Sequence, residues 1–406
     1  MRASSNGHEF IVKCYVDPRQ SFYYLSRVHA GLLELQRRGR IRLRLTFSKP
    51  VDGLTDDPPW TPWLEVSNRR TGETRTAVID LGDWSKVFAL DALKNCDVYF
   101  KRNLFEPDLE HVPDTLRARV QPFGFNYACL ARRQKRKILS RVVPGLLYVT
   151  LRSPNREYPS FKKRLLHLRQ FLKSPPIESY EQSPHHSVDP IVFFHARVWP
   201  KPSYTDRDVE EETNRPRAEL VRALKKEFKN RFLGGLAPNE HARRHYPDLI
   251  SDYSGRRDEY IAAMRRALVA VASPHCVRTS SFKLAEYLAA SRCIVCPPYP
   301  HRLPAPLIDG VNYLGFRTVD ECIERCARLL EDRGMAEEMR LKNWQYYQTH
   351  VAPAQHMENL LSRVFEASAS SQPGVRPPDS GIVQYFAGSQ PERSRTSVGK
   401  ESISVR

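Results

Sequence analysis

The second half of the chain alternates short apolar runs with segments of helical length, and this alternation most constrains the fold. Residues 191–194, Ile-Val-Phe-Phe, are apolar without a break, which is typical of a strand covered on both faces. Strands separated by helices predict an α/β domain with a parallel sheet. Further strands are predicted at 231–236, 267–272 and 293–296, and helices at 218–228, 257–266, 320–330 and 335–347.

The first half shows the same alternation. Strands are predicted at 10–16, 41–47, 77–81 and 98–102, and helices at 24–37 and 88–94. We therefore expect an α/β protein with two Rossmann-like parallel-sheet domains, residues 1–130 and 188–365. A basic, proline-containing helical insertion or linker, 131–187, joins them. Residues 366–406 are rich in Ser, Pro, Gly and Arg, which predicts a disordered tail.

Residues 278–298 combine a polar turn, an amphipathic helix and a buried strand that ends at two prolines. The turn supplies three candidate helix N-caps, Thr279, Ser280 and Ser281. With Arg278 and Lys283 beside it, the start of this helix suits a phosphate group. Glu286 follows inside the helix and could accept hydrogen bonds from sugar or ribose hydroxyls. The ordinary alternative is a surface helix with a serine cap and scattered charges.

The chain carries a formal net charge of +18, which favours an anionic partner. Lys and Arg cluster at 132–137 and 162–169, although a solvated helix face would give the same pattern. These clusters lack interleaved aromatic residues, so we expect no nucleic-acid partner. An apolar run of 18 residues and a secretory signal are both missing from the sequence, which predicts a cytoplasmic protein.

Eight cysteines raise the question of a metal site, and two of them have the spacing C-x-x-C at Cys293 and Cys296. Because these two lie in a predicted strand, their side chains should point to opposite faces. Buried free thiols are therefore favoured over zinc ligands. We expect no bound metal.

The order of elements after residue 190 resembles the C-terminal, nucleotide-sugar-binding domain of GT-B glycosyltransferases of the group 1 type. The helix segment 286–291, Glu-Tyr-Leu-Ala-Ala-Ser, is similar to the family's Glu-Ala-x-Ala-x-Gly. Residues 309–316, Asp-Gly-Val-Asn-Tyr-Leu-Gly-Phe, match a second signature at compatible spacing. The resemblance covers about 190–365 and implies two Rossmann-like domains that face a cleft, the first of them binding the acceptor.

The resemblance also implies roles for individual residues. Glu286 would bind the ribose of the nucleotide. Arg197 and Lys201 would neutralise the diphosphate, so that a sugar nucleotide is used as substrate without a cofactor or metal. The polar turn would meet the same diphosphate through Thr279, Ser280, Ser281 and the free amides after them. Many retaining members have a glutamate where this chain has Arg278, which we expect to bind a phosphate instead.

A catalytic base would come from the first domain. Asp83, after the predicted strand 77–81, is the candidate, with a loop cap as the ordinary alternative and Asp17 as the next choice. His195 could orient a donor phosphate or be a satisfied interior histidine.

These features predict a metal-independent glycosyltransferase that moves a sugar from a nucleotide-sugar to a polysaccharide or lipid-linked acceptor. The basic residues of 131–169 would suit an anionic membrane surface at the inner face of the membrane. The alternatives are an inactive module that binds a nucleotide-sugar or a partner, a sugar-nucleotide epimerase on the same fold, and a nucleic-acid-binding protein suggested only by charge.

Overall fold

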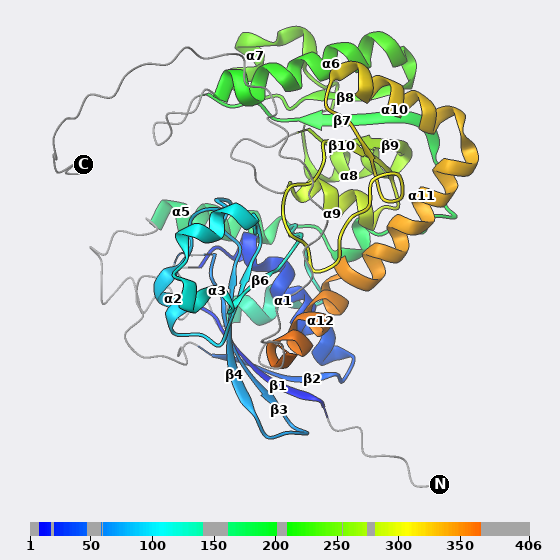
Figure 1. The fold of residues 1–406 in the computed structure, drawn as a ribbon. Helices are drawn as coiled ribbons and strands as arrows, with labels where there is room; N and C mark the ends of the chain where they lie inside the picture. Colours follow the sequence, from blue (N-terminus) through cyan, green and yellow to red (C-terminus); the bar gives the residue numbers. More distant parts are fainter. Residues whose placement is uncertain are drawn as a thin grey trace, which may run out of the picture. The chain divides into compact units, whose positions relative to one another are not determined.

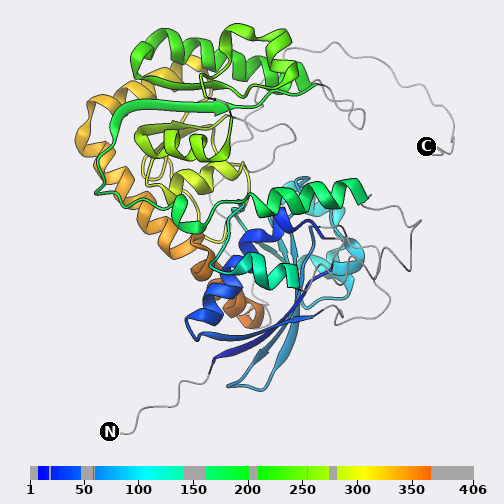
Figure 2. The same ribbon diagram turned by 180° about the vertical axis from the view of Figure 1, so that it is seen from behind.

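The computed structural model describes residues 8–17, 20–46, 58, 60–140, 161–200, 209–253, 255–273 and 281–366. The chain divides into two compact units, 1–372 and 373–406. The second unit lies outside the described residues, as does the predicted tail apart from Glu366. Both sheets belong to the first unit (Figures 1 and 2).

The first sheet has six strands in the order β2-β1-β3-β4-β5-β6. Its strands are β1 (Phe10–Tyr15), β2 (Ile41–Thr46), β3 (Trp63–Asn68), β4 (Thr74–Asp80), β5 (Val98–Lys101) and β6 (Val120–Pro122). The pairs β1–β2, β4–β5 and β5–β6 are parallel, as predicted. β3 is antiparallel to both of its neighbours and was missed from the sequence, although Trp63, Leu64 and Val66 are buried along it.

Helices cover both faces of this sheet. On one face, α1 (Phe22–Arg37), α5 (Phe161–Leu172) and α12 (Pro353–Glu366) pack over the apolar side chains of β1 and β4. On the other face, α2 (Leu90–Lys94) packs with Trp63 and Tyr99. The short helix α3 (Asp114–Arg117) precedes β6. The last described helix thus packs against α1, far from it in sequence (Figure 1).

The second sheet has five parallel strands in the order β11-β10-β9-β7-β8. These are β7 (Asp189–Ala196), β8 (Phe232–Leu236), β9 (Ala267–Val271), β10 (Cys293–Cys296) and β11 (Leu314–Gly315). The helices between and after them are α6 (Arg215–Phe228), α7 (Glu240–His245), α8 (Arg257–Arg266), α9 (Phe282–Ala289), α10 (Val319–Glu331) and α11 (Arg333–Tyr346). The predicted α/β class with two sheets is therefore confirmed. The second sheet is parallel throughout, whereas the antiparallel β3 makes the first sheet mixed.

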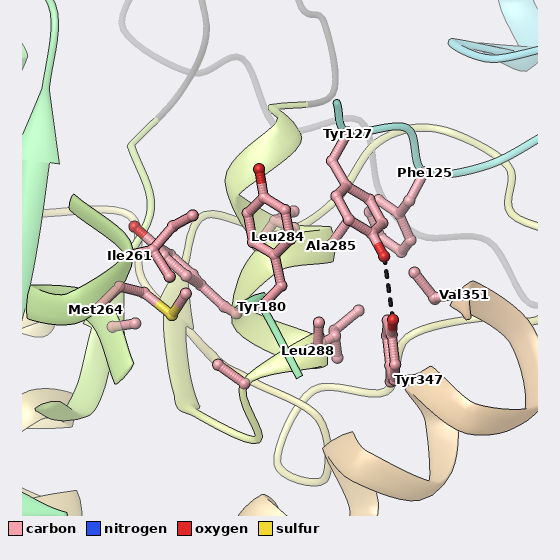
Figure 3. Packing of buried hydrophobic residues seen from close by; sticks show 14 of the residues in the cluster. Phe125, Tyr127, Tyr180, Ile261, Met264, Leu284, Ala285, Leu288, Tyr347 and Val351 are labelled. Carbon is pink, nitrogen blue, oxygen red and sulfur yellow. Dashed lines mark hydrogen bonds between the residues drawn. The ribbon is translucent and has the colours of Figure 1, made fainter. Parts of the chain in front are cut away.

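Alternate residues of the second sheet enter two different cores. Val192 and Phe194 pack with α6 and α10, whereas Phe193 packs with α8 and α9. Figure 3 shows part of the second of these cores, which includes Ile261 of α8 and Leu284 of α9. Cys293 and Cys296 are both buried free thiols, and they belong to these two different cores. The expectation that the C-x-x-C side chains point to opposite faces is thus confirmed.

β7 and β8 approach each other closely at a glycine. Gly234 has φ of +142°, and a Cβ built on it would lie 1.9 Å from the carbonyl oxygen of Phe194. Only glycine fits this position, because an added methyl group would overlap the backbone of the neighbouring strand.

The predicted domain boundaries stay a prediction. The first sheet ends at Pro122 and the second begins at Asp189, but α12 lies within the predicted second domain and packs on α1. Within the described part of the chain, no helix is both long and apolar enough to cross a membrane.

Candidate functional site

The strand order of the second sheet reverses between β7 and β9. From β7 the chain continues outward to β8, whereas β9, β10 and β11 follow on the other side. Ligands of open α/β sheets bind at such a switch point, beyond the carboxyl ends of the strands. Arg197 and Ser273, which follow β7 and β9, therefore mark the edge where a ligand is expected.

α9 begins beside this edge with a side-chain cap. The Oγ of Ser281 accepts a hydrogen bond from the backbone N of Lys283 at 3.2 Å, which confirms that Ser281 is the N-cap. The side chain of Lys283 turns back to the sheet, where its Nζ donates to the carbonyl oxygen of His195 at the end of β7. The first turn of α9 and the end of β7 are thus joined through a lysine.

Lys283 lies in a group of cations. Burial and the charges of Arg217, Arg197 and Arg257 together lower the pKa of Lys283 to about 7, while Glu286 acts in the opposite sense. The three arginines are close enough to disfavour the charged form of a partly buried lysine. Such a cluster of positive charges favours the binding of an anion. A diphosphate would supply the negative charge that these described side chains share.

His195 is buried beside the same cations. Burial and the charges of Lys283, Arg197 and Arg257 together lower its pKa to about 3, so that the imidazole is neutral near pH 7. Its ring packs against Tyr253 with centroids 5.0 Å apart. Nε2 is buried and has no hydrogen-bond partner among the described residues. Both expected roles of His195, orienting a donor phosphate and packing as a satisfied interior residue, stay predictions.

Glu286 is held by an arginine that the sequence analysis did not single out. Arg257, at the start of α8, pairs with Oε1 of Glu286 and also donates to the hydroxyl of Tyr180 at 3.1 Å. The Glu286 side chain is 1% exposed and that of Arg257 is 37% exposed. Oε2 accepts no hydrogen bond from a described residue. A ribose could reach Glu286 only after Arg257 or another neighbour moves.

Arg217 is a second cation that was missed. It lies on α6, is almost fully buried, and stacks on Trp199 with 4.9 Å between its Cζ and the ring centroid. Arg217 shares the apolar face of α6 with Val221, Leu224 and Phe228. An arginine on the apolar stripe of a helix was the sequence signal that could have revealed it.

Asp83 pairs with a buried arginine that follows β5 of the first sheet. Its Oδ1 accepts from the buried Arg102 at 2.7 Å, and its Oδ2 accepts from the hydroxyl of Tyr24 at 3.3 Å. Arg102 in turn stacks on Phe282, the first residue of α9, at 4.9 Å. Asp83 is thus a structural anion for a buried arginine in this conformation, and its role as catalytic base stays a prediction.

The structure brings together Arg197, Lys283 and Glu286 with the N-cap Ser281. Four other predicted site residues, Lys201, Arg278, Thr279 and Ser280, lie outside the described residues. Among those that are described, no group of three or more His, Cys, Asp or Glu side chains could hold a metal ion. Metal independence remains an expectation.

The second predicted signature forms a turn that leads into β11. Asn312 is buried, with its Oδ1 accepting from the backbone N of Ile308 at 3.0 Å and its Nδ2 donating to Asn343 at 3.2 Å. Asp309 accepts from the backbone N of Gly315 at 2.9 Å. These contacts indicate that residues 309–316 fix the turn before β11 and pack this turn against α11.

Part of the second half of the chain is similar to a known protein family. The model of a family described as "Glycosyl transferase-like" matches residues 215–362, from the start of α6 into α12. Residues 215–362, less than half of the chain, are thus similar to this family. The match confirms the predicted group 1-like GT-B resemblance over this part of the chain. No curated protein matches the sequence.

Solved structures similar to the chain include glycosyltransferases and an epimerase. The C-terminal domain of a glycosyl transferase group 1 family protein from Francisella tularensis is 13% identical, with a TM-score of 0.28, covering 39% of this chain and 84% of that one. A mutant of TarM from S. aureus, in a complex that includes UDP, is 11% identical, with a TM-score of 0.34, covering 74% and 61%. UDP-GlcNAc 2-epimerase from Neisseria meningitidis is 12% identical, with a TM-score of 0.35, covering 84% and 96%.

Proposed function

We propose that this protein is a glycosyltransferase that binds a nucleoside-diphosphate sugar at the carboxyl edge of its second sheet. The observation that carries the proposal is the group of Lys283, Arg197, Arg217 and Arg257 beside the N-terminus of α9. When the sugar is transferred, negative charge develops on the leaving diphosphate. Fixed cations and free helix amides stabilise that charge without a bound metal.

The sugar acceptor is proposed to be a polysaccharide or lipid-linked glycan. Basic side chains in 131–169 would bring the protein to an anionic membrane surface from the cytoplasm. Support comes from the exposure of Arg132, Arg133, Lys135, Arg136 and Lys137. In α5, Leu165 and Leu166 are also 57% and 51% exposed. Apolar side chains next to cations are the combination that binds at a lipid headgroup layer.

The first experiment is a thermal-shift panel of nucleotide-sugars on the full chain. We expect one donor to raise the melting temperature because a ligand that binds only the folded state stabilises it. The Lys283→Met variant should lose this shift, whereas Lys342→Met, on an exposed part of α11, should keep it. A panel without any shift would contradict the proposal.

Activity is tested separately with the donor that binds. Release of the nucleoside diphosphate together with transfer of the sugar to an acceptor would support a glycosyltransferase. Binding without turnover across a range of acceptors would favour the inactive module. Conversion of the bound nucleotide-sugar to its epimer would favour a sugar-nucleotide epimerase.

The membrane proposal has its own test. Sedimentation with vesicles that contain anionic lipid should carry down the wild-type chain, and the bound fraction should fall as salt is added. Leu165→Gln combined with Leu166→Gln should reduce binding at fixed salt. Equal binding to neutral and anionic vesicles would contradict an electrostatic contribution.

A further inference from the structure

The segment that leaves β7 is held by side chains at three successive residues. These contacts run from Arg217 to the carbonyl of Arg197 at 2.6 Å, from Asn239 to the carbonyl of Val198 at 2.8 Å, and from Asn214 to the carbonyl of Trp199 at 2.7 Å. Asn214 also accepts from the backbone N of Trp199 at 3.1 Å. The backbone that carries Arg197 is therefore fixed before any ligand binds.

Arg217 differs from the other two because it also reaches the neighbouring strand. Its Nε donates to the Oγ of Ser273 at 3.1 Å, just after the end of β9. Ser273 is the last described residue before 274–280, the segment that contains three of the predicted diphosphate ligands. One guanidinium thus connects the two chain segments that leave the sheet on either side of its switch point.

We infer that Arg217 is a positioning residue of the diphosphate site. Its guanidinium holds the exits of β7 and β9 at a fixed separation, so that Arg197 is kept in place at the edge where the diphosphate is proposed to bind. The inference rests on the proposed function and adds a role for a residue outside the predicted ligand set. Besides adding its charge to the cation group, Arg217 acts through the backbone of Arg197 and through Ser273.

An arginine is required here for a geometrical reason. The planar guanidinium has five donors in fixed directions, so one group can serve the carbonyl of Arg197 and the hydroxyl of Ser273 together. A lysine would keep the positive charge but would present a single ammonium on a flexible chain. Arg217→Lys therefore separates the effect of charge from the effect of position, since small displacements of binding groups weaken their action.

The test compares Arg217→Lys with Arg222→Lys, the same substitution on the exposed side of α6, where the side chain is 51% exposed. A third variant, Ser273→Ala, removes only the contact to the β9 exit and is the milder change if Arg217→Lys folds poorly. The probes are UDP, GDP, ADP and inorganic pyrophosphate, with the nucleosides as references. Binding is measured by calorimetry on the full chain.

We expect Arg217→Lys to bind the preferred nucleoside diphosphate at least about 10-fold more weakly, the scale of one hydrogen bond to a charged group. Ser273→Ala should weaken it in the same direction, and Arg222→Lys should change it by less than about twofold. Nucleoside binding should not change. If the wild-type protein binds the diphosphate and Arg217→Lys binds it with an affinity within about twofold, the inference about Arg217 is wrong, but the proposed function is not affected. Failure of the wild-type protein to bind any probe would overturn the proposed function as well.

Discussion

Lys283 makes the proposed site sensitive to pH. Its pKa of about 7 in the folded chain lies below the ordinary value of 10.5, because burial and three arginines disfavour the charged form. A bound diphosphate would favour the charged form and raise this pKa. Above pH 7, binding should therefore take up a proton at Lys283, and affinity should fall as the pH rises through 7 towards the raised pKa.

Calorimetry in two buffers of different ionisation enthalpy measures this proton uptake. Lys283→Arg is the matched control because an arginine stays protonated throughout, so that uptake at this position should disappear. The same pKa shift predicts that the stability of the ligand-free protein rises between pH 7 and 10.5. In that range the unfolded lysine binds a proton that the folded one does not. Binding in the wild-type protein without any proton uptake at pH 8 would contradict the role of Lys283.

Glu286 is predicted to distinguish ribonucleotides from their deoxy analogues. Glu286→Gln keeps the shape of the side chain but removes the negative charge that faces Arg257. We expect the preference for a nucleoside diphosphate over its 2′,3′-dideoxy analogue to fall, because an amide accepts hydrogen bonds from hydroxyls less strongly than a carboxylate. Competition binding with the two ligands measures the ratio. An unchanged ratio would remove Glu286 from the ribose site.

At the scale of elements, the effect of the α9 N-cap on stability can be measured separately from its effect on ligand binding. Ser281→Ala should cost about 1 kcal/mol of unfolding free energy. Thr318→Ala is the matched control, because Thr318 caps α10 with its side chain accepting from Glu321. Both variants should be destabilised in urea by similar amounts, but only Ser281→Ala should bind a nucleoside diphosphate more weakly. Equal binding by the two would place the ligand away from α9.

The contact between β7 and β8 predicts a large stability effect. Gly234→Ala would place a methyl group 1.9 Å from the carbonyl oxygen of Phe194, so the strands must separate. We expect a loss of about 3 kcal/mol or more. Gly72→Ala, at φ of +75° with nothing within 4 Å of the added Cβ, should cost only about 1 kcal/mol. Similar urea midpoints for the two variants would contradict this account of the β7–β8 packing.

The sequence patterns located most elements because local periodicity and burial agree there. Residues 257–266 were predicted with the bounds that α8 has, and β10 was read correctly from four apolar residues. The strand β3 was missed, since its antiparallel pairing with β1 and β4 depends on partners distant in sequence.

For the site, the helix cap and Lys283 were visible as local motifs. The partners of Arg217, Arg257 and Tyr180 were not visible, because only the fold brings these residues to the ends of β7 and β9 or to Glu286. The pairing of Asp83 with Arg102 likewise depends on the alignment of β4 with β5. Local patterns thus predict caps and buried strands, whereas partners of a charged side chain follow from tertiary packing.

At the scale of the whole molecule, the net charge of +18 should increase the attraction of any anion to the protein at low salt. A specific diphosphate site must therefore be distinguished from general attraction to a basic protein. Nonspecific attraction is screened by added salt, with a Debye length of about 8 Å at physiological ionic strength. Binding of a diphosphate that is enclosed by Lys283 and its arginines should persist under these conditions.

The most direct test of the account is calorimetric titration of the full chain with UDP, GDP and ADP at pH 6.5 and 0.15 M salt. We predict that at least one binds at a single site, more tightly than its nucleoside. Arg197→Ala and Lys283→Met should each abolish that binding while the protein remains folded by circular dichroism. Absence of binding by all three nucleotides, or unchanged binding in both folded variants, would contradict the claim that the carboxyl edge of the second sheet holds the diphosphate of a sugar donor.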